Sequence, residues 1–237
     1  MRTAAALTVA AATASHLLPS VLTIPALHQA VAPALSGIAP TAHVALTFDD
    51  GPDPASTPHF LAELDRLGLH ATFFVLGSQL VANPDVAHEV LAAGHEIGVH
   101  GWLHRPHLLR APWRVRTDLD RAYRAVHELL GVAPRFARPP NGVITGAGLW
   151  AARSLSLRTV LWTADGRDWA QDATAESVAT RIQARLRPGG VILLHDSDVT
   201  SAAGSWRSAL GALPMLAEHC ATRGWPLGPL REHLPAG

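Results

Sequence analysis

Short apolar runs alternate along the chain with longer segments whose apolar residues recur every three or four positions. Short apolar runs suit the strands of a parallel sheet that helices cover on both faces. We expect strands at residues 44–48, 72–76, 96–99, 136–138, 159–162 and 191–194. Alternating strands and helices predict an α/β domain, built either as a barrel or as a doubly wound layer.

Four of the intervening segments have clear helical periodicity. One begins at Ser56-Thr57-Pro58, which combines a capping residue with a first-turn proline. A second spans residues 112–130, a third ends at Gly189-Gly190, and a fourth leads up to Cys220. Their expected buried positions are Phe60, Leu61, Leu64 and Leu67; Leu119, Ala122, Val126 and Leu129; Val178, Ile182 and Leu186; and Leu210, Leu213, Ala217 and Cys220.

Residues 1–40 differ from the rest, because they are rich in Ala, Leu and Pro and carry Arg2 as their only formal charge. Arg2, the apolar run 4–14 and the small-residue triplet 12–14 are typical of a secretory signal peptide. Prolines interrupt the apolar pattern further on, so no stretch reaches the roughly 20 residues that cross a bilayer. We predict a leader over 1–40, either an export signal or a membrane-associated segment, before one domain over 41–237. The alternative is an apolar segment that packs against that domain.

Composition excludes several functional classes. Nineteen acidic residues balance nineteen basic ones, so no basic field marks a nucleic-acid partner. Every basic residue is Arg, which rules out a Schiff-base lysine and the lysine of a phosphate-binding loop. The single Cys220 rules out an intramolecular disulfide and a multi-cysteine zinc site. The oligomeric state is left open.

Titratable residues follow five of the predicted strands. The active site of a parallel α/β fold gathers beyond the carboxyl ends of its strands. The residues at these positions are Asp49-Asp50, His100, the turn 138–142, the segment 165–169 and His195-Asp196. Packing alone does not explain why titratable residues follow five different strands, so we predict a functional site at this edge of the sheet.

A carboxylate and two imidazoles in this set suggest a metal site. Neighbours on an extended chain point to opposite sides, so one of Asp49 and Asp50 can bind a metal while the other faces the substrate. His100 and His104 stand four residues apart, a spacing that lets both rings bind one ion. Two imidazoles and a carboxylate leave positions for water and substrate in hydrolytic metal sites. The alternative for the aspartates is a solvated turn.

Three further residues suit acid–base chemistry. Arg138, in a proline-stiffened turn, can grip a carboxylate in bidentate fashion and keep it ionised. The backbone N–H groups of that turn could face a developing oxyanion. His195, with an acidic partner, suits a general acid whose pKa is raised by a nearby carboxylate. His95 and His107 are expected at the surface or behind the metal ligands.

Five segments resemble, in order, the motifs of the polysaccharide deacetylase family, also called the NodB-homology or carbohydrate esterase family 4 domain. They are TFDDGP (47–52), HGWLH (100–104), RPPNG (138–142), DGRDW (165–169) and LLHD (193–196). The resemblance covers about residues 43–220. It implies a distorted (β/α)7-type barrel and a groove for an extended sugar chain.

The resemblance also implies residue roles. One divalent metal, usually Zn2+ with Co2+ or another ion tolerated, would be bound by Asp50, His100 and His104. The catalytic residues would be Asp49 as base, positioned by Arg138, and His195 as acid, tuned by Asp168. The substrate-binding residues would be Asn141, Trp169 and Leu193.

Two positions depart from the family pattern. Gly101 stands where the family usually has Ser or Thr, whose hydroxyl supports the metal-binding loop. Asn141 stands where an aromatic side chain is usual, so a stacking surface for a sugar is absent there. Metal affinity and substrate preference are therefore the properties expected to differ.

The implied reaction is removal of acetyl groups, most readily N-acetyl groups of N-acetylglucosamine units, from a polysaccharide or its oligomers. Two alternatives stay open: a hydrolase of a small amide or cyclic imide on the same fold, and a catalytically silent carbohydrate-binding module. Retention of Asp49, His195 and all three metal ligands argues against both. We expect an exported or envelope-associated protein, with peripheral membrane association through residues 1–40 and a cytoplasmic location as alternatives.

Overall fold

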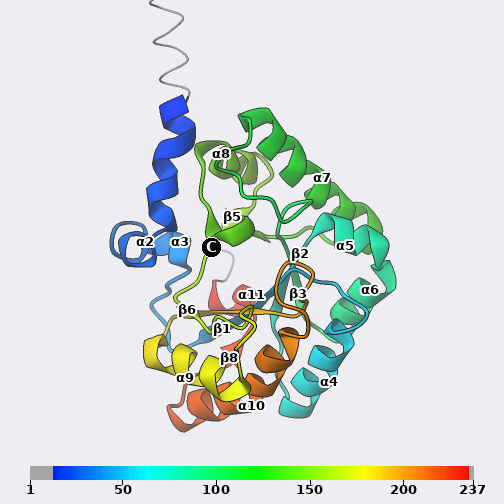
Figure 1. Cartoon of the computed structure of the whole chain (residues 1–237), viewed down its shortest axis with the longest axis vertical. Helices are drawn as coiled ribbons and strands as arrows, with labels where there is room; N and C mark the ends of the chain where they lie inside the picture. The colour runs from blue at the N-terminus through cyan, green and yellow to red at the C-terminus, as the bar shows by residue number, and fades with distance from the viewer. Residues whose placement is uncertain (1–12, 235–237) are drawn as a thin grey trace, which may run out of the picture.

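A computed structural model of the chain, which describes residues 13–234, contains one curled parallel sheet ringed by helices (Figure 1). Its strands are β1 (Val44–Asp49), β2 (Thr72–Val75), β3 (Glu96–Val99), β4 (Phe136–Ala137), β5 (Arg158–Thr159), β6 (Ala164–Asp165), β7 (Val191–His195) and β8 (Leu227–Gly228). The order is β5-β4-β3-β2-β1-β7-β6, with β8 beside the start of β1. All of these pairings are parallel, and the prediction of a distorted (β/α)7-type barrel is confirmed.

The helices begin and end where local chemistry allows. They are η1 (Leu18–Thr23), α2 (Pro25–Val31), α3 (Pro33–Ser36), α4 (Thr57–Leu67), α5 (Gly77–Ala82), α6 (Pro84–Ala92), α7 (Pro112–Leu130), η2 (Pro140–Gly142), α8 (Gly146–Ser154), α9 (Ala175–Arg185), α10 (Trp206–Thr222) and α11 (Leu230–His233). Proline stands in the first turn of α4, α6 and α7, where its missing N–H costs no hydrogen bond. A left-handed glycine ends α4 and α7.

Strand β1 lies inside the sheet between β2 and β7, and every one of its residues is buried. Phe48 on β1 packs against Phe60 of α4 and Phe73 of β2, with ring centroids 5.1 and 5.0 Å apart. The register places Asp49 opposite Phe74 on one side and His195 on the other. Residues at the carboxyl ends of β1 and β7 therefore lie at the same level.

The predicted strand over 159–162 is wrong, because only Thr159 belongs to a strand there and β6 begins at Ala164. The carbonyls of Val160 and Leu161 accept hydrogen bonds from the Arg138 side chain, and the chain crosses between the two ends of the strand order. Other strands match within a residue or two. Helices α5, α6 and α8 and strand β8 were not predicted.

The expected set of buried positions on α7 is also wrong at its last member, Leu129. Leu129 is 41% exposed, whereas Leu130 is buried. The helical repeat of about 3.6 residues carries the buried face from Val126 to position 130 rather than 129. Among the other expected positions, Phe60, Leu64, Val178, Ile182 and Cys220 are confirmed as buried.

Most of the run 4–14 predicted as an export signal lies outside the described residues. The described part of the N-terminal segment contacts the sheet and its loops. The Leu161 N–H donates to the Leu35 carbonyl at 2.6 Å, and the Ile144 N–H donates to the Thr23 hydroxyl at 3.4 Å. Within residues 13–234, the length and hydropathy needed for a membrane-spanning helix are not found together in any helix.

Candidate active site

Side chains from separate strand ends converge on one cleft of about 270 Å³. Its lining residues are Asp49, His100, His104, Asn141, Gly142, Trp162, Trp169, Leu193, His195 and Thr200. Asp49 ends β1 and His195 ends β7, and these two strands are paired in register. The parallel sheet therefore brings together residues that are distant in sequence.

Arg138 holds the carboxylate of Asp49 from behind. Its Nη1 donates to Asp49 Oδ1 at 2.7 Å and to the Thr47 hydroxyl at 2.8 Å, and the side chain is buried. Burial by itself raises the pKa of Asp49, but Arg138 and the nearby imidazoles outweigh it, and the pKa lies below its usual value. The expected bidentate grip is wrong, because the remaining N–H groups of Arg138 bind backbone carbonyls.

Asp50, His100 and His104 form a group that fits a metal ion. One ligand atom from each lies within 4.8 Å of the others. Oδ1 of Asp50 is 3.5 Å from His100 Nε2 and 3.7 Å from His104 Nε2, and this buried oxygen has no hydrogen-bond partner among the described residues. His100 Nδ1 donates to the Arg138 carbonyl at 2.9 Å. Its other ring nitrogen, Nε2, therefore carries the lone pair that can bind a metal. Burying the Asp50 oxygen without a partner costs free energy, and a cation bound between this oxygen and the two imidazole nitrogens would offset that cost.

Thr200 fixes the other oxygen of Asp50. Its hydroxyl donates to Asp50 Oδ2 at 2.5 Å from the loop that follows β7. The two carboxylate oxygens are therefore distinct, since Oδ2 is held by the protein and Oδ1 is left for the ion. Sequence reasoning missed Thr200, and no motif or spacing in the chain marks it.

Asp196 shapes the turn that carries Asp50. Its carboxylate accepts from the Gly51 N–H at 3.2 Å and from the Thr57 hydroxyl at 2.5 Å, which ties the turn to the start of α4. A Cβ at Gly51 would overlap with this carboxylate, so the turn requires glycine. Burial raises the pKa of Asp196 to about 7.

His195, which lines the cleft, is paired with the buried Asp168. The His195 ring Nδ1 donates to Asp168 Oδ1 at 3.1 Å, and the His195 backbone N–H donates to Oδ2 at 2.7 Å. Burial lowers the pKa of His195, but Asp168 outweighs it and raises the pKa to about 10. The imidazole is therefore protonated at neutral pH. The ring of Trp169 meets it edge-on at 5.5 Å.

The loop that carries His104 is held by a residue that sequence reasoning also missed. Asp118 of α7 accepts from the Trp102 N–H at 2.7 Å and from Arg110 Nη1 at 2.8 Å. Gly101 has φ of 92°, and a Cβ there would lie 3.0 Å from the Asp118 carboxylate. Asp118 thus supports the loop at the point where a hydroxyl is absent.

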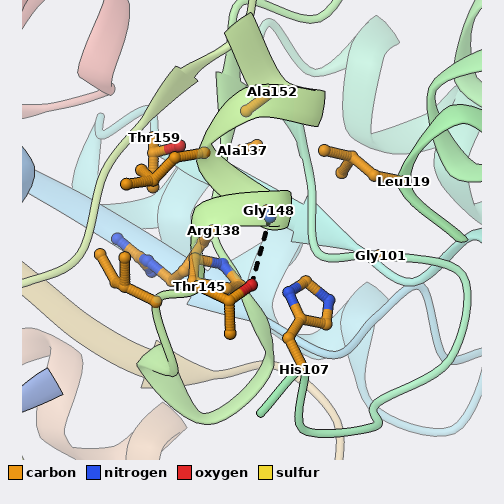
Figure 2. Close-up of a pocket in the computed structure, with 12 residues that line it drawn as sticks. Gly101, His107, Leu119, Ala137, Arg138, Thr145, Gly148, Ala152 and Thr159 are labelled. Carbon is orange, nitrogen blue, oxygen red and sulfur yellow. Dashed lines mark hydrogen bonds between the residues drawn. The ribbon is translucent and has the colours of Figure 1, made fainter. Parts of the chain in front are cut away.

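Asn141 has φ of 56°, a left-handed conformation that Asn adopts more readily than most residues. Leu193 and Trp169 line the same cleft, and their expected role in binding substrate stays a prediction. His95 and His107 are both buried, and neither belongs to the metal-binding group. Figure 2 shows His107 in a small apolar pocket beside the active site, between the Gly101 loop and the start of α8.

Comparisons with known proteins all match this chain to polysaccharide deacetylases. The model of the polysaccharide deacetylase family matches residues 37–160. The chitooligosaccharide deacetylase of Bradyrhizobium sp. (strain ANU 289) is 34% identical over 204 residues, covering 81% of this chain and 90% of that protein. The peptidoglycan-N-acetylglucosamine deacetylase of Listeria monocytogenes is 34% identical over 160 residues. That match covers 68% of this chain, which spans only about a third of the Listeria protein (34%).

Solved structures agree with these relatives. A peptidoglycan N-acetylglucosamine deacetylase solved with a benzamide compound has a TM-score of 0.78 at 29% identity, covering 86% of this chain and 92% of that one. A family 4 carbohydrate esterase from Streptomyces lividans, solved with acetate, has a TM-score of 0.70 at 28% identity. That second match covers 79% of this chain and 91% of the esterase.

Proposed function

The chain belongs to the polysaccharide deacetylase family, and from that premise we propose that it hydrolyses N-acetyl groups on N-acetylglucosamine units of a cell-envelope polysaccharide or its oligomers. One observation carries the proposal. The Arg138-held carboxylate of Asp49 and the Asp168-held imidazolium of His195 line the same cleft as the metal-binding group. A base, an acid and a cation site around one cleft suit hydrolysis of an amide.

Asp50, His100 and His104 would hold one divalent ion, and we propose Zn2+ because imidazole and carboxylate ligands suit it. When bound, such an ion acts as a Lewis acid on water and on the acetyl carbonyl. The ligand set has one negative charge, so the site keeps a net positive charge that favours a developing oxyanion.

Two protein side chains, Asp49 and His195, would carry out the two proton transfers of the reaction. Asp49, ionised by its contact with Arg138, would accept a proton from the attacking water. His195 would donate its proton to the amine nitrogen as the C–N bond breaks, yielding acetate and a free amine. Asp168 keeps that imidazole protonated and fixes its ring.

The remaining lining residues would bind the substrate. Leu193 and Trp169 would accommodate the acetyl methyl group, and the turn at Asn141 would direct a backbone N–H toward the oxyanion. Asn141 cannot stack on a sugar, so we propose a weaker aromatic contribution to binding at this position.

The names of the relatives support a location at the cell envelope, since several act on peptidoglycan. We propose that the protein is exported or envelope-associated and that residues 1–40 are the leader. A hydrolase of a small amide is the second candidate. Equal activity on a small amide and on acetylated oligomers would favour it.

The decisive experiment separates the two adjacent carboxylates. With chitin oligomers as substrate, Asp49→Asn should abolish acetate release while bound zinc stays near one per chain. Asp50→Asn should lose most of the zinc, measured by elemental analysis of the dialysed protein. If both variants kept their zinc and comparable activity, the assigned roles would be wrong.

A further inference from the structure

The charges of this neutral chain are strongly segregated. Residues 49–96 contain eight acidic residues and one Arg. Residues 97–117 contain four Arg and no acidic residue, and residues 129–164 repeat that composition. The first of these two segments forms the loop before α7 and the first turns of α7, and the second contains α8. Within them, Arg110 is paired with Asp118 and Arg138 is buried against Asp49. Three exposed arginines, Arg105, Arg114 and Arg116, remain in the loop before α7 and in its first turns, although the chain as a whole is neutral.

Large apolar side chains are exposed in this basic region. Leu109 is 95% exposed, Trp113 is 69% exposed and Trp150 is 53% exposed. The guanidinium of Arg116 lies 4.5 Å from the centre of the Trp150 ring, which joins α7 to α8 at the surface. We define the Arg–Trp patch as Trp113, Arg116 and Trp150, which line one groove, together with the exposed Arg105, Leu109 and Arg114 from the loop before α7 and its first turn.

The N-terminal segment adjoins the patch. His16 lines the same groove as Trp113, Arg116 and Trp150. The N-terminal helical residues and α8 lie at the same end of the molecule, the upper end in Figure 1. The neighbouring helix η1 adds exposed apolar residues, with Leu18 66% exposed and Val21 50% exposed. The described part of the N-terminal segment therefore adds exposed apolar side chains close to the patch.

We propose that the Arg–Trp patch binds the surface of an anionic lipid bilayer. Arginines attract acidic headgroups, and tryptophan prefers the interface between headgroups and acyl chains. An anionic polymer in solution would use the arginines but would leave Leu109 in water. A neutral glycan could stack on the tryptophans but would not require the exposed arginines beside them. Only a bilayer uses both properties of the patch.

The test is sedimentation of the full chain with vesicles of phosphatidylcholine and phosphatidylglycerol in equal parts, compared with phosphatidylcholine alone. We expect binding to the anionic vesicles that weakens as salt is added. Arg105→Gln/Arg114→Gln should lower the partition coefficient about fivefold for each charge removed. Trp113→Ser/Trp150→Ser should lower it about tenfold or more, because both indoles lose their place in the interface.

Leu129→Ser is the matched control, since Leu129 is exposed on the same helix at its far end. It should bind as the wild type does, and thermal melting should confirm that all variants are folded. Equal binding of the wild type to both kinds of vesicle would overturn the proposal. So would wild-type binding by both double variants, because residues outside the patch would then carry the interaction. Binding of polyphosphate without binding of vesicles would assign the patch to an anionic polymer instead.

Discussion

Arg138 shows how much one side chain does in this site. Its Nη1 fixes Asp49, its carbonyl accepts from His100, and its other N–H groups bind the carbonyls of Val160 and Leu161. The proposed base, one proposed metal ligand and the segment that crosses between β5 and β6 are therefore held by the same residue. Two other side-chain contacts, Thr200 with Asp50 and Asp168 with His195, each act on one residue of the site and can be tested separately.

Thr200 fixes one oxygen of Asp50, the proposed metal ligand. Thr200→Val keeps the shape of the side chain but removes the hydrogen bond to Oδ2. We expect about 10- to 100-fold weaker zinc binding, measured by competition with a chelating dye, because Asp50 is no longer fixed. Thr200→Ser, which restores the hydroxyl, should recover most of the affinity. Equal zinc affinity in Thr200→Val and the wild type would contradict this role.

Asp168 should set the pH range in which His195, the proposed general acid, carries its proton. The pKa of His195 is raised to about 10, so its protonated form is lost only as pH rises through that value. Asp168→Asn removes the largest raising influence, and the alkaline limb of kcat/KM should move about one to three pH units toward neutrality. The measurement is a pH profile of acetate release. An unchanged alkaline limb would show that another group supplies the proton.

At the scale of elements, helix α7 does more than cover the sheet. Its buried Asp118 holds the loop that ends in His104, a proposed metal ligand. Packing of this helix against the barrel therefore also positions the loop, which carries Gly101 without the hydroxyl that is usual at that position.

Asp118→Ala should destabilise both the fold and the metal site. The change leaves the Trp102 N–H without its acceptor and Arg110 without its partner, at a cost of about 2–3 kcal/mol in unfolding free energy. Zinc binding should weaken in parallel. Asp120→Ala is the control on the same helix, since its exposed pair with Arg124 contributes under about 1 kcal/mol. Similar losses in the two variants would argue against a specific role for Asp118.

At the scale of the whole molecule, the fold buries imidazoles that serve no catalytic step. His95 and His107 are both buried, and burial lowers the pKa of each to about 4. Both ring nitrogens of His107 are without a hydrogen-bond partner among the described residues. The folded state therefore holds these rings neutral at pH values where the unfolded chain protonates them.

Acid should destabilise the protein through these histidines. Their pKa is lower in the folded state, so the stability they confer is present above pH 6.5 and is lost as pH falls toward about 4. For His107 the loss amounts to about 3 kcal/mol. In metal-free protein, His107→Leu should remove that part of the pH dependence in urea unfolding. The exposed His88→Gln should leave it unchanged, and an unaltered slope in His107→Leu would refute the assignment.

The sequence by itself determined the strand–helix alternation, five strand-end motifs and the residues of the metal-binding group. These features can be read from short stretches of sequence, because each motif lies at or directly after the apolar run that forms its strand. Only the tertiary structure decided the roles of Thr200 and Asp118, the crossing at 160–163 and the single bond from Arg138 to Asp49. Thr200 and Asp50 stand 150 positions apart, and a hydroxyl in a loop has no pattern that names its partner. Such contacts depend on how the barrel closes, which local periodicity does not specify.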